Sequence, residues 1–85
     1  MNTSLFYPEK AMATIEEMKS KAMKHWAKWR PGETAELKAE GSFERNAAAA
    51  AKMAFEEQEM LLMQGYRMHE AEEVVLKQFI LKPPE

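Results

Sequence analysis

The residues with most capacity for chemistry in this chain are two histidines and several clustered glutamates. His69 opens a His-Glu-Ala-Glu-Glu run that begins like the metal-binding helix of the zinc proteases. Such a helix needs a second histidine four residues later, because both imidazoles reach the metal from one face, and Glu73 stands there instead. His25 is the only other histidine, and the chain contains no cysteine. We therefore expect no metal site and no bound cofactor.

The glutamates could in principle supply a general acid and a general base. They form two groups in the second half of the chain: Glu56, Glu57 and Glu59, then Glu70, Glu72 and Glu73. Acid and base catalysis by paired carboxylates needs environments that separate their pKa values, and no nucleophile or pocket motif accompanies these groups. Solvated helix surface accounts for them, so we predict that the protein is not an enzyme.

Methionines interspersed with the glutamates indicate a protein-binding surface. Methionine is flexible and polarisable, so it adapts to irregular partner surfaces, and eight of the 85 residues are methionine. Met53, Met60 and Met63 cannot share one helix face with Phe55 and Leu62, so this segment should carry a second apolar face. We expect a protein partner there, with a second copy of the chain as one candidate. The candidate binding residues are Glu56, Glu59, Met60, Met63, Glu72 and Glu73.

A basic segment supports an alternative function, that of a nucleic-acid-binding adaptor. Residues 1–31 carry six cations against three glutamates, a net charge of +3, whereas residues 32–85 carry six cations against eleven glutamates. Cations beside tryptophans suit contacts to phosphates and bases, and the candidates are Lys21, Lys24, Lys28 and Arg30. However, this basic excess is small for a nucleic-acid-binding module. Trp26 and Trp29 also fall on an apolar stripe, so we expect both indoles in the core.

Helices should position all of these groups. Apolar residues recur every three or four positions from Pro8 to Arg30, which predicts one amphipathic helix ended by Pro31 and Gly32. A short helix should follow over residues 33–40, with Gly41 as its left-handed terminal residue.

The second half of the chain predicts two further helices. Ser42 suits an N-cap whose hydroxyl accepts an amide N–H at the start of a long helix over residues 43–64. A fourth helix should begin at His69 or Glu70 and end near Gln78. The alanine run 47–51 lets another helix approach closely, so the first and third helices should form the main contact, with the fourth closing one end.

The expected fold is all-α: a small bundle of three to four helices, two long, one short and one C-terminal. Residues 1–85 should form a single helical domain, with 1–7 and 82–85 as tails. The residues expected to be largely buried are Ile15, Met18, Ala22, Trp26, Leu37, Phe43, Ala50, Ala54, Phe55, Leu62, Val75 and Phe79.

Composition also predicts where the protein acts. The chain lacks the basic start and apolar run of a secretory signal, and no segment approaches the ~20 apolar residues of a membrane helix. A small secreted domain usually relies on disulfides, which this chain cannot form. We therefore expect no membrane association and a cytoplasmic location.

Two resemblances follow from longer patterns. The basic helix with His25-Trp26, the Pro-Gly break, the alanine-rich helix and the closing Phe79-Ile80-Leu81 resemble small helical proteins encoded by bacteriophages and prophages, which have no assigned activity. That resemblance implies a bacterial host cytosol and, by analogy, binding of host proteins as an accessory or inhibitor. Residues 61–66 and 69–76 resemble the first two helices of ubiquitin-associated domains, although Gln64 interrupts the Met-Gly step of that motif.

Overall fold

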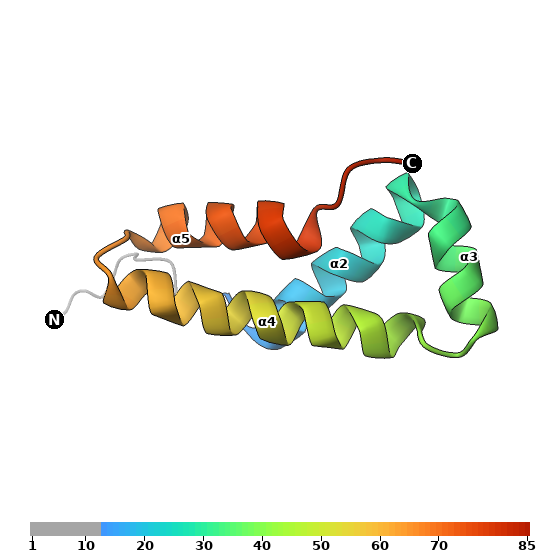
Figure 1. Cartoon of the computed structure of the whole chain (residues 1–85), viewed down its shortest axis with the longest axis horizontal. Helices are drawn as coiled ribbons and strands as arrows, with labels where there is room; N and C mark the ends of the chain where they lie inside the picture. The colour runs from blue at the N-terminus through green and yellow to red at the C-terminus, as the bar shows by residue number, and fades with distance from the viewer. Residues whose placement is uncertain (1–12) are drawn as a thin grey trace, which may run out of the picture.

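The computed structural model describes residues 13–85, and it confirms the expected all-α bundle (Figure 1). The described part contains no strand. Its elements are α2 (Ile15–Trp29), α3 (Pro31–Ala39), α4 (Phe43–Met63), α5 (Met68–Val75) and a π-helical turn, η1 (Leu76–Ile80), that continues α5. The predicted tail 1–7 and the predicted helical residues 8–12 lie outside the described residues.

Helix α2 begins later than the sequence analysis predicted. Ala13 and Thr14 are not helical, and the Thr14 hydroxyl accepts a 3.1 Å hydrogen bond from the Glu17 amide while Glu17 accepts a 2.9 Å bond from the Thr14 amide. This reciprocal capping box satisfies amide groups that the first turn of a helix leaves unpaired. An uninterrupted helix from Pro8 is therefore wrong, because the capping box fixes a start at Ile15.

Of the predicted residues at the ends of α3, Gly41 has the expected role, whereas Pro31 and Ser42 do not. Pro31 starts α3 instead of preceding a gap, since a proline lacks the N–H that the first position leaves unused. Gly41 has a φ of 73°, as expected for a left-handed helix end. Ser42 precedes α4, but its hydroxyl makes no capping bond and instead donates a long 3.4 Å contact to the Leu37 carbonyl. The predicted capping role of that hydroxyl is thus wrong.

The main helix contact joins α2 and α4, as predicted. The buried residues of α4 recur every three or four positions and are Phe43, Ala47, Ala51, Ala54, Gln58 and Leu61. Against them lie Met18, Ala22 and Trp26 of α2. Three alanines in the α4 row leave little side-chain bulk between the helices, so α2 can approach closely and the larger α2 side chains fill the space.

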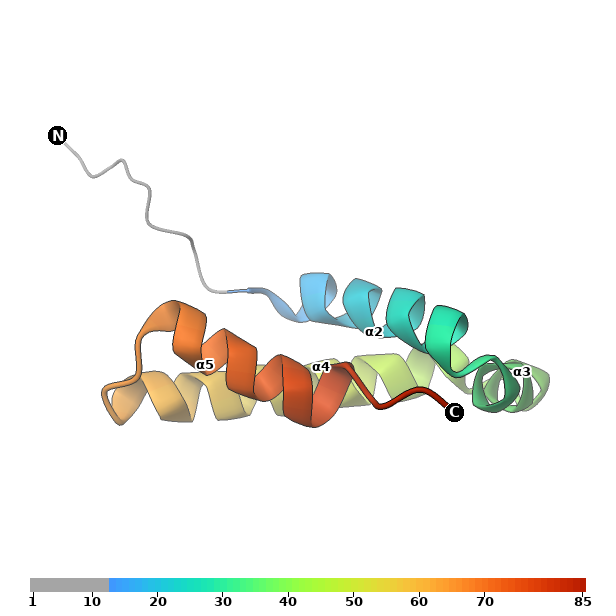
Figure 2. The same cartoon turned by 90° about the horizontal axis from the view of Figure 1, so that it is seen from above.

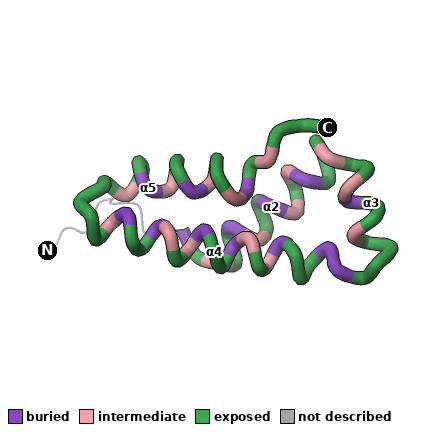
Figure 3. The backbone as a smooth tube through the Cα atoms, viewed as in Figure 1, coloured by how far each residue is buried: buried purple, intermediate pink, exposed green. Residues whose placement is uncertain are grey.

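Helix α5 does not simply close one end of the bundle. It runs back alongside α4, and η1 also contacts α2 (Figures 1 and 2). The fully buried Ala71 and Val75 of α5 face the other helices. Figure 3 shows the buried positions, in purple, along the inner sides of α4 and α5. The body measures 50 × 24 × 19 Å, which is about two helix diameters thick. Every helix therefore keeps one side in solvent.

Of the twelve residues predicted to be largely buried, six are buried and six are only partly buried. Buried as expected are Met18, Ala22, Trp26, Phe43, Ala54 and Val75. Only partly buried are Ile15, Leu37, Ala50, Phe55, Leu62 and Phe79. In α4 the difference is one of angular position, because the row that contains Ala54 reaches Leu61 seven residues later and leaves Leu62 at its edge.

The π-helical turn brings Ile80 into the core. The Leu81 amide donates a 2.6 Å hydrogen bond to the Leu76 carbonyl, five residues back, which is the π-helical spacing. A continuing α-helix would put Gln78, three residues after the buried Val75, on the inner side. In the wider turn Gln78 is exposed and Ile80 is fully buried.

The segment 82–85 is not the free tail that we expected. The Glu85 side chain accepts hydrogen bonds from the amides of Gly32 (3.1 Å) and Glu33 (2.7 Å), in the first turn of α3. The Glu85 amide in turn donates a 3.0 Å bond to the Trp29 carbonyl. A carboxylate suits this place, because the first amides of a helix lack intrahelical acceptors and carry a partial positive charge.

Candidate functional site

The run that begins at His69 serves to start a helix in this structure. The Glu70 carboxylate accepts a 3.1 Å hydrogen bond from the Arg67 amide, and His69 itself is exposed. Among residues 13–85, no three histidine or glutamate side chains come close enough together to hold a metal ion. Two exposed helix surfaces carry most of the other predicted residues.

One such surface runs along the side of α4 that faces away from α2 and α5. We call it the α4 outer surface, and its exposed residues are Asn46, Ala49, Lys52, Met53, Glu56, Glu59, Met60 and Met63. Positions three, four and seven apart lie on one side of a helix, so this row is opposite the buried row of the same helix. It brings together four of the six predicted protein-binding residues: Glu56, Glu59, Met60 and Met63.

The methionines of the α4 outer surface are unusually open to solvent. Met53, Met60 and Met63 keep 54%, 52% and 87% of their surface exposed. Met53 was absent from the predicted site, although its seven-residue spacing from Met60 places both on one side of the helix. This seven-residue spacing, visible in the sequence, could have added Met53 to the predicted binding residues.

The structure does not bring the other two predicted residues, Glu72 and Glu73, to this surface. Glu72 lies in a groove of about 320 Å³ between α2 and α5, which Met18 and Leu76 also line. Glu73 is exposed and borders a separate depression beside Leu81. Successive positions of a helix point in different directions, so α5 sends its two glutamates to different places.

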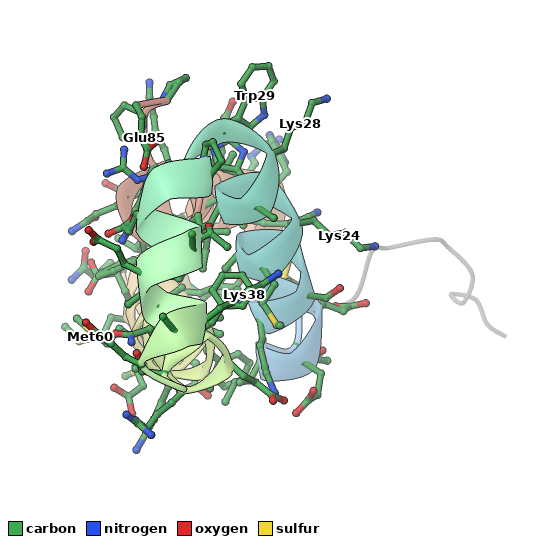
Figure 4. All side chains as sticks on the ribbon, turned by 90° about the vertical axis from the view of Figure 1, so that its right-hand side faces the viewer. Lys24, Lys28, Trp29, Lys38, Met60 and Glu85 are labelled. Carbon is green, nitrogen blue, oxygen red and sulfur yellow. The ribbon has the colours of Figure 1, made fainter. Side chains whose placement is uncertain are left out.

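Three of the four predicted nucleic-acid-binding residues share one side of α2. Lys21, Lys24 and Lys28 are exposed and follow one another at intervals of three and four residues. Figure 4 shows Lys24 and Met60 on opposite sides of the molecule. The lysine side of α2 and the α4 outer surface are therefore separate surfaces.

Arg30 does not lie with the three lysines. Its Nε donates a 2.7 Å hydrogen bond to the Glu33 carboxylate, and its Nη1 donates a 2.6 Å bond to the Pro83 carbonyl. The pKa of Glu33 is lowered, first by the Arg30 hydrogen bond and also by the nearby Lys82. Arg30 thus ties the start of α3 to the end of the described chain.

Trp29 is not a core residue, contrary to the sequence-based expectation. It is 44% exposed, whereas Trp26 is 2% exposed. Trp26 packs edge-on to Phe43, the first residue of α4, with ring centroids 6.5 Å apart. Trp29 lies nearly one turn further along α2, beyond the point where α4 begins. The ammonium of Lys28 lies 4.9 Å from its ring centroid, a cation–π distance.

A second ion pair joins α2 to α4 at the other end of the lysine side. Lys19 Nζ lies 2.6 Å from the Glu44 carboxylate. Their hydrogen bond raises the pKa of Lys19 and lowers that of Glu44. Glu44 is largely exposed, so this contact orients the helices and contributes little to stability.

The chain matches no protein-family model, no curated protein and no solved structure. Within residues 13–85, each helix is too short or too polar to cross a bilayer.

Proposed function

We propose that this protein is a non-catalytic, protein-binding accessory or inhibitor protein of bacteriophage type, which acts through the α4 outer surface. The observation that carries the proposal is the exposure of Met53, Met60 and Met63 along one side of the longest helix. Burying a methionine side chain contributes about 1.5–3 kcal/mol. Met63 is mostly exposed and Met53 and Met60 are about half exposed, so folding leaves part of this energy available for binding.

The charged residues of the surface indicate the chemistry of a partner. Glu56 and Glu59 lie beside Met60 and Met63 in the second half of α4, and all four side chains are exposed. An apolar partner surface bordered by cations would match them, since opposite charges steer association and select the partner. The cytoplasm of a bacterial host is the proposed location, supported by the cysteine-free composition.

Affinity capture with matched variants tests this function. The tagged protein is immobilised at low density, exposed to bacterial lysate, and retained proteins are identified by mass spectrometry. Met60→Glu together with Met63→Glu should abolish retention of a specific protein, because charges replace the apolar contact. Lys24→Glu, on the opposite side of the molecule, should retain it. Equal retention by all three proteins would contradict the proposal.

The exposed Trp29 favours a second candidate function, nucleic-acid binding along α2. An indole with the Lys28 ammonium beside it can stack on a base, while Lys21 and Lys24 contact phosphates. Binding of a single-stranded oligonucleotide should then weaken with a log–log salt slope of about −1.4 to −2.1, for two to three phosphates neutralised. Trp29→Ala and Lys24→Glu should each reduce the affinity. No binding at low salt would exclude this function.

A further inference from the structure

We infer that the α4 outer surface is self-complementary and that its partner is a second copy of this chain, packed with the two α4 helices antiparallel. The inference rests on the proposed function, because it names the partner of the same surface. It follows from the order in which small, large and charged residues occur along the surface.

The middle row of the surface forms a two-helix seam. Its residues recur at intervals of three and four and are Asn46, Ala49, Met53, Glu56, Met60 and Met63. This spacing is the heptad pattern by which two helices pack side by side. The first half of the seam is small, with the Asn46 amide folded back onto the Ser42 carbonyl at 2.8 Å. The second half is large.

Antiparallel packing matches the small half of one copy with the large half of the other. Met60 of each copy lies opposite Ala49 of its partner, and Met63 lies opposite Asn46. A two-fold axis near the middle of α4 repeats each contact twice, as an isologous dimer requires. Parallel packing would instead set methionine against methionine and alanine against alanine, leaving a gap at one end and crowding at the other.

The charges that flank the seam agree with the same direction. Lys52 and Glu59 are seven residues apart on one side of the methionines, and both are exposed. No ion pair within residues 13–85 involves either of them. In the antiparallel dimer, Lys52 of each copy faces Glu59 of the other, whereas parallel packing sets the two Glu56 carboxylates directly opposite each other in the seam.

The dimer should be weak and reversible. Helix α4 has 21 residues and a length of about 32 Å, so a single helix pair buries an area at the low end of specific interfaces. Glu56 also lies at the centre of the seam, opposite Met53 of the partner, where a charge opposes burial. Monomer and dimer should therefore exchange in the micromolar range, which leaves the surface free at lower concentration.

Sedimentation equilibrium over micromolar to millimolar concentrations tests the inference with a charge-swap pair. The unchanged protein should show a monomer–dimer equilibrium. Lys52→Glu and Glu59→Lys should each weaken the dimer at least tenfold, because each places like charges opposite one another twice. An equimolar mixture of the two variants should form a heterodimer, in which both pairs regain opposite charges. Lys24→Glu is the matched control and should dimerise like the unchanged protein.

Two outcomes overturn the inference. One is an unchanged protein that remains monomeric at millimolar concentration, and the other is a Lys52→Glu variant that dimerises normally. The proposed function fails separately, when Met60→Glu with Met63→Glu leaves capture from lysate unaltered. Since the chain lacks cysteine, a mixture of Ala49→Cys and Met60→Cys proteins gives an independent readout. The disulfide-linked dimer should contain one of each, and a predominance of Ala49→Cys homodimers would indicate parallel packing.

Discussion

The indole Nε1 of Trp26 donates a 2.7 Å hydrogen bond to the carbonyl oxygen of Ile80, and both residues are buried. The bond joins the middle of the bundle to the last residue of η1, 54 positions later in the chain. Lys82 covers the same indole, with its ammonium 4.4 Å from the ring centroid. Trp26 thus holds α2 and the C-terminal segment together through its polar edge as well as its ring.

Replacing this indole should be costly, and replacing its exposed neighbour should not. Trp26→Phe removes the indole donor to the buried Ile80 carbonyl and leaves a small cavity, so we expect a loss of about 2–4 kcal/mol in unfolding free energy. Trp29→Phe should cost less than about 0.5 kcal/mol. Urea unfolding followed by circular dichroism measures both, and equal losses would show that the indole bond is unimportant.

The alanine row of α4 should tolerate no enlargement. Ala51 is fully buried between helices, so Ala51→Leu forces α2 away and should cost about 1–3 kcal/mol. Ala27 on α2 is exposed, and Ala27→Leu is the control that should leave the melting temperature nearly unchanged. If both variants melt like the unchanged protein, the helices do not pack as closely as the structure shows.

The ion pair of Arg30 and Glu33 should make stability depend on pH. The pKa of Glu33 is lowered by Arg30, so the pair stabilises the fold above the pKa of an unfolded glutamate. That contribution is lost as the pH falls through the lowered folded-state pKa. Unfolding of the unchanged protein and of Glu33→Gln should differ by less than about 1 kcal/mol at neutral pH and converge in acid. A difference that grows on acidification has the wrong sign for this mechanism.

The Glu85 carboxylate should stabilise the first turn of α3. Glu85→Ala leaves the Gly32 and Glu33 amides without their acceptor, at a cost of about 0.5–1 kcal/mol. Hydrogen exchange of those two amides should accelerate more than exchange in α4. Glu85→Gln, which keeps an oxygen acceptor, should lie between the alanine variant and the unchanged protein. Unaltered exchange in the alanine variant would mean that the cap does not persist in solution.

Gln58 should be replaceable by an apolar residue of similar length. It is fully buried, and its Nε2 donates a 3.2 Å hydrogen bond to the Ala13 carbonyl. Its Oε1 has no partner among the described residues, and a buried orphan acceptor costs about 1–3 kcal/mol. Gln58→Met should therefore raise the free energy of unfolding by about 0.5–1 kcal/mol. A loss instead would show that the bond to Ala13 outweighs the orphan.

Periodicity predicted the helices well because it reports local geometry. The N-cap expected at Ser42 placed the start of α4 at Phe43, and the predicted end at residue 64 lies within one residue of Met63. The late start of α2 could also have been predicted, since Thr14 and Glu17 have the capping-box spacing. The periodic row could not say where α4 begins relative to α2, so the exposure of Trp29 was missed.

Contacts between distant parts of the chain left no local signal. Nothing in the sequence near Glu85 indicates that its carboxylate caps α3. Nothing near Arg30 indicates that its guanidinium donates a hydrogen bond to the Pro83 carbonyl. For the candidate site, four of six protein-binding residues follow from their spacing on α4. The surroundings of Glu72 and Glu73 depend on how α5 packs against the other helices. Spacing along the sequence does not predict that packing.

The widened turn at Leu76–Ile80 shifts the helical register of the residues that follow it. Because it takes up one more residue than an α-helical turn, every later residue is rotated and displaced relative to a regular helix. Deleting a single residue there would leave most of α5 untouched. Ile80 would then follow Val75 by four positions, the spacing that keeps both on one side of an ordinary α-helix, so its carbonyl would stay near Trp26 and Glu85 within reach of α3.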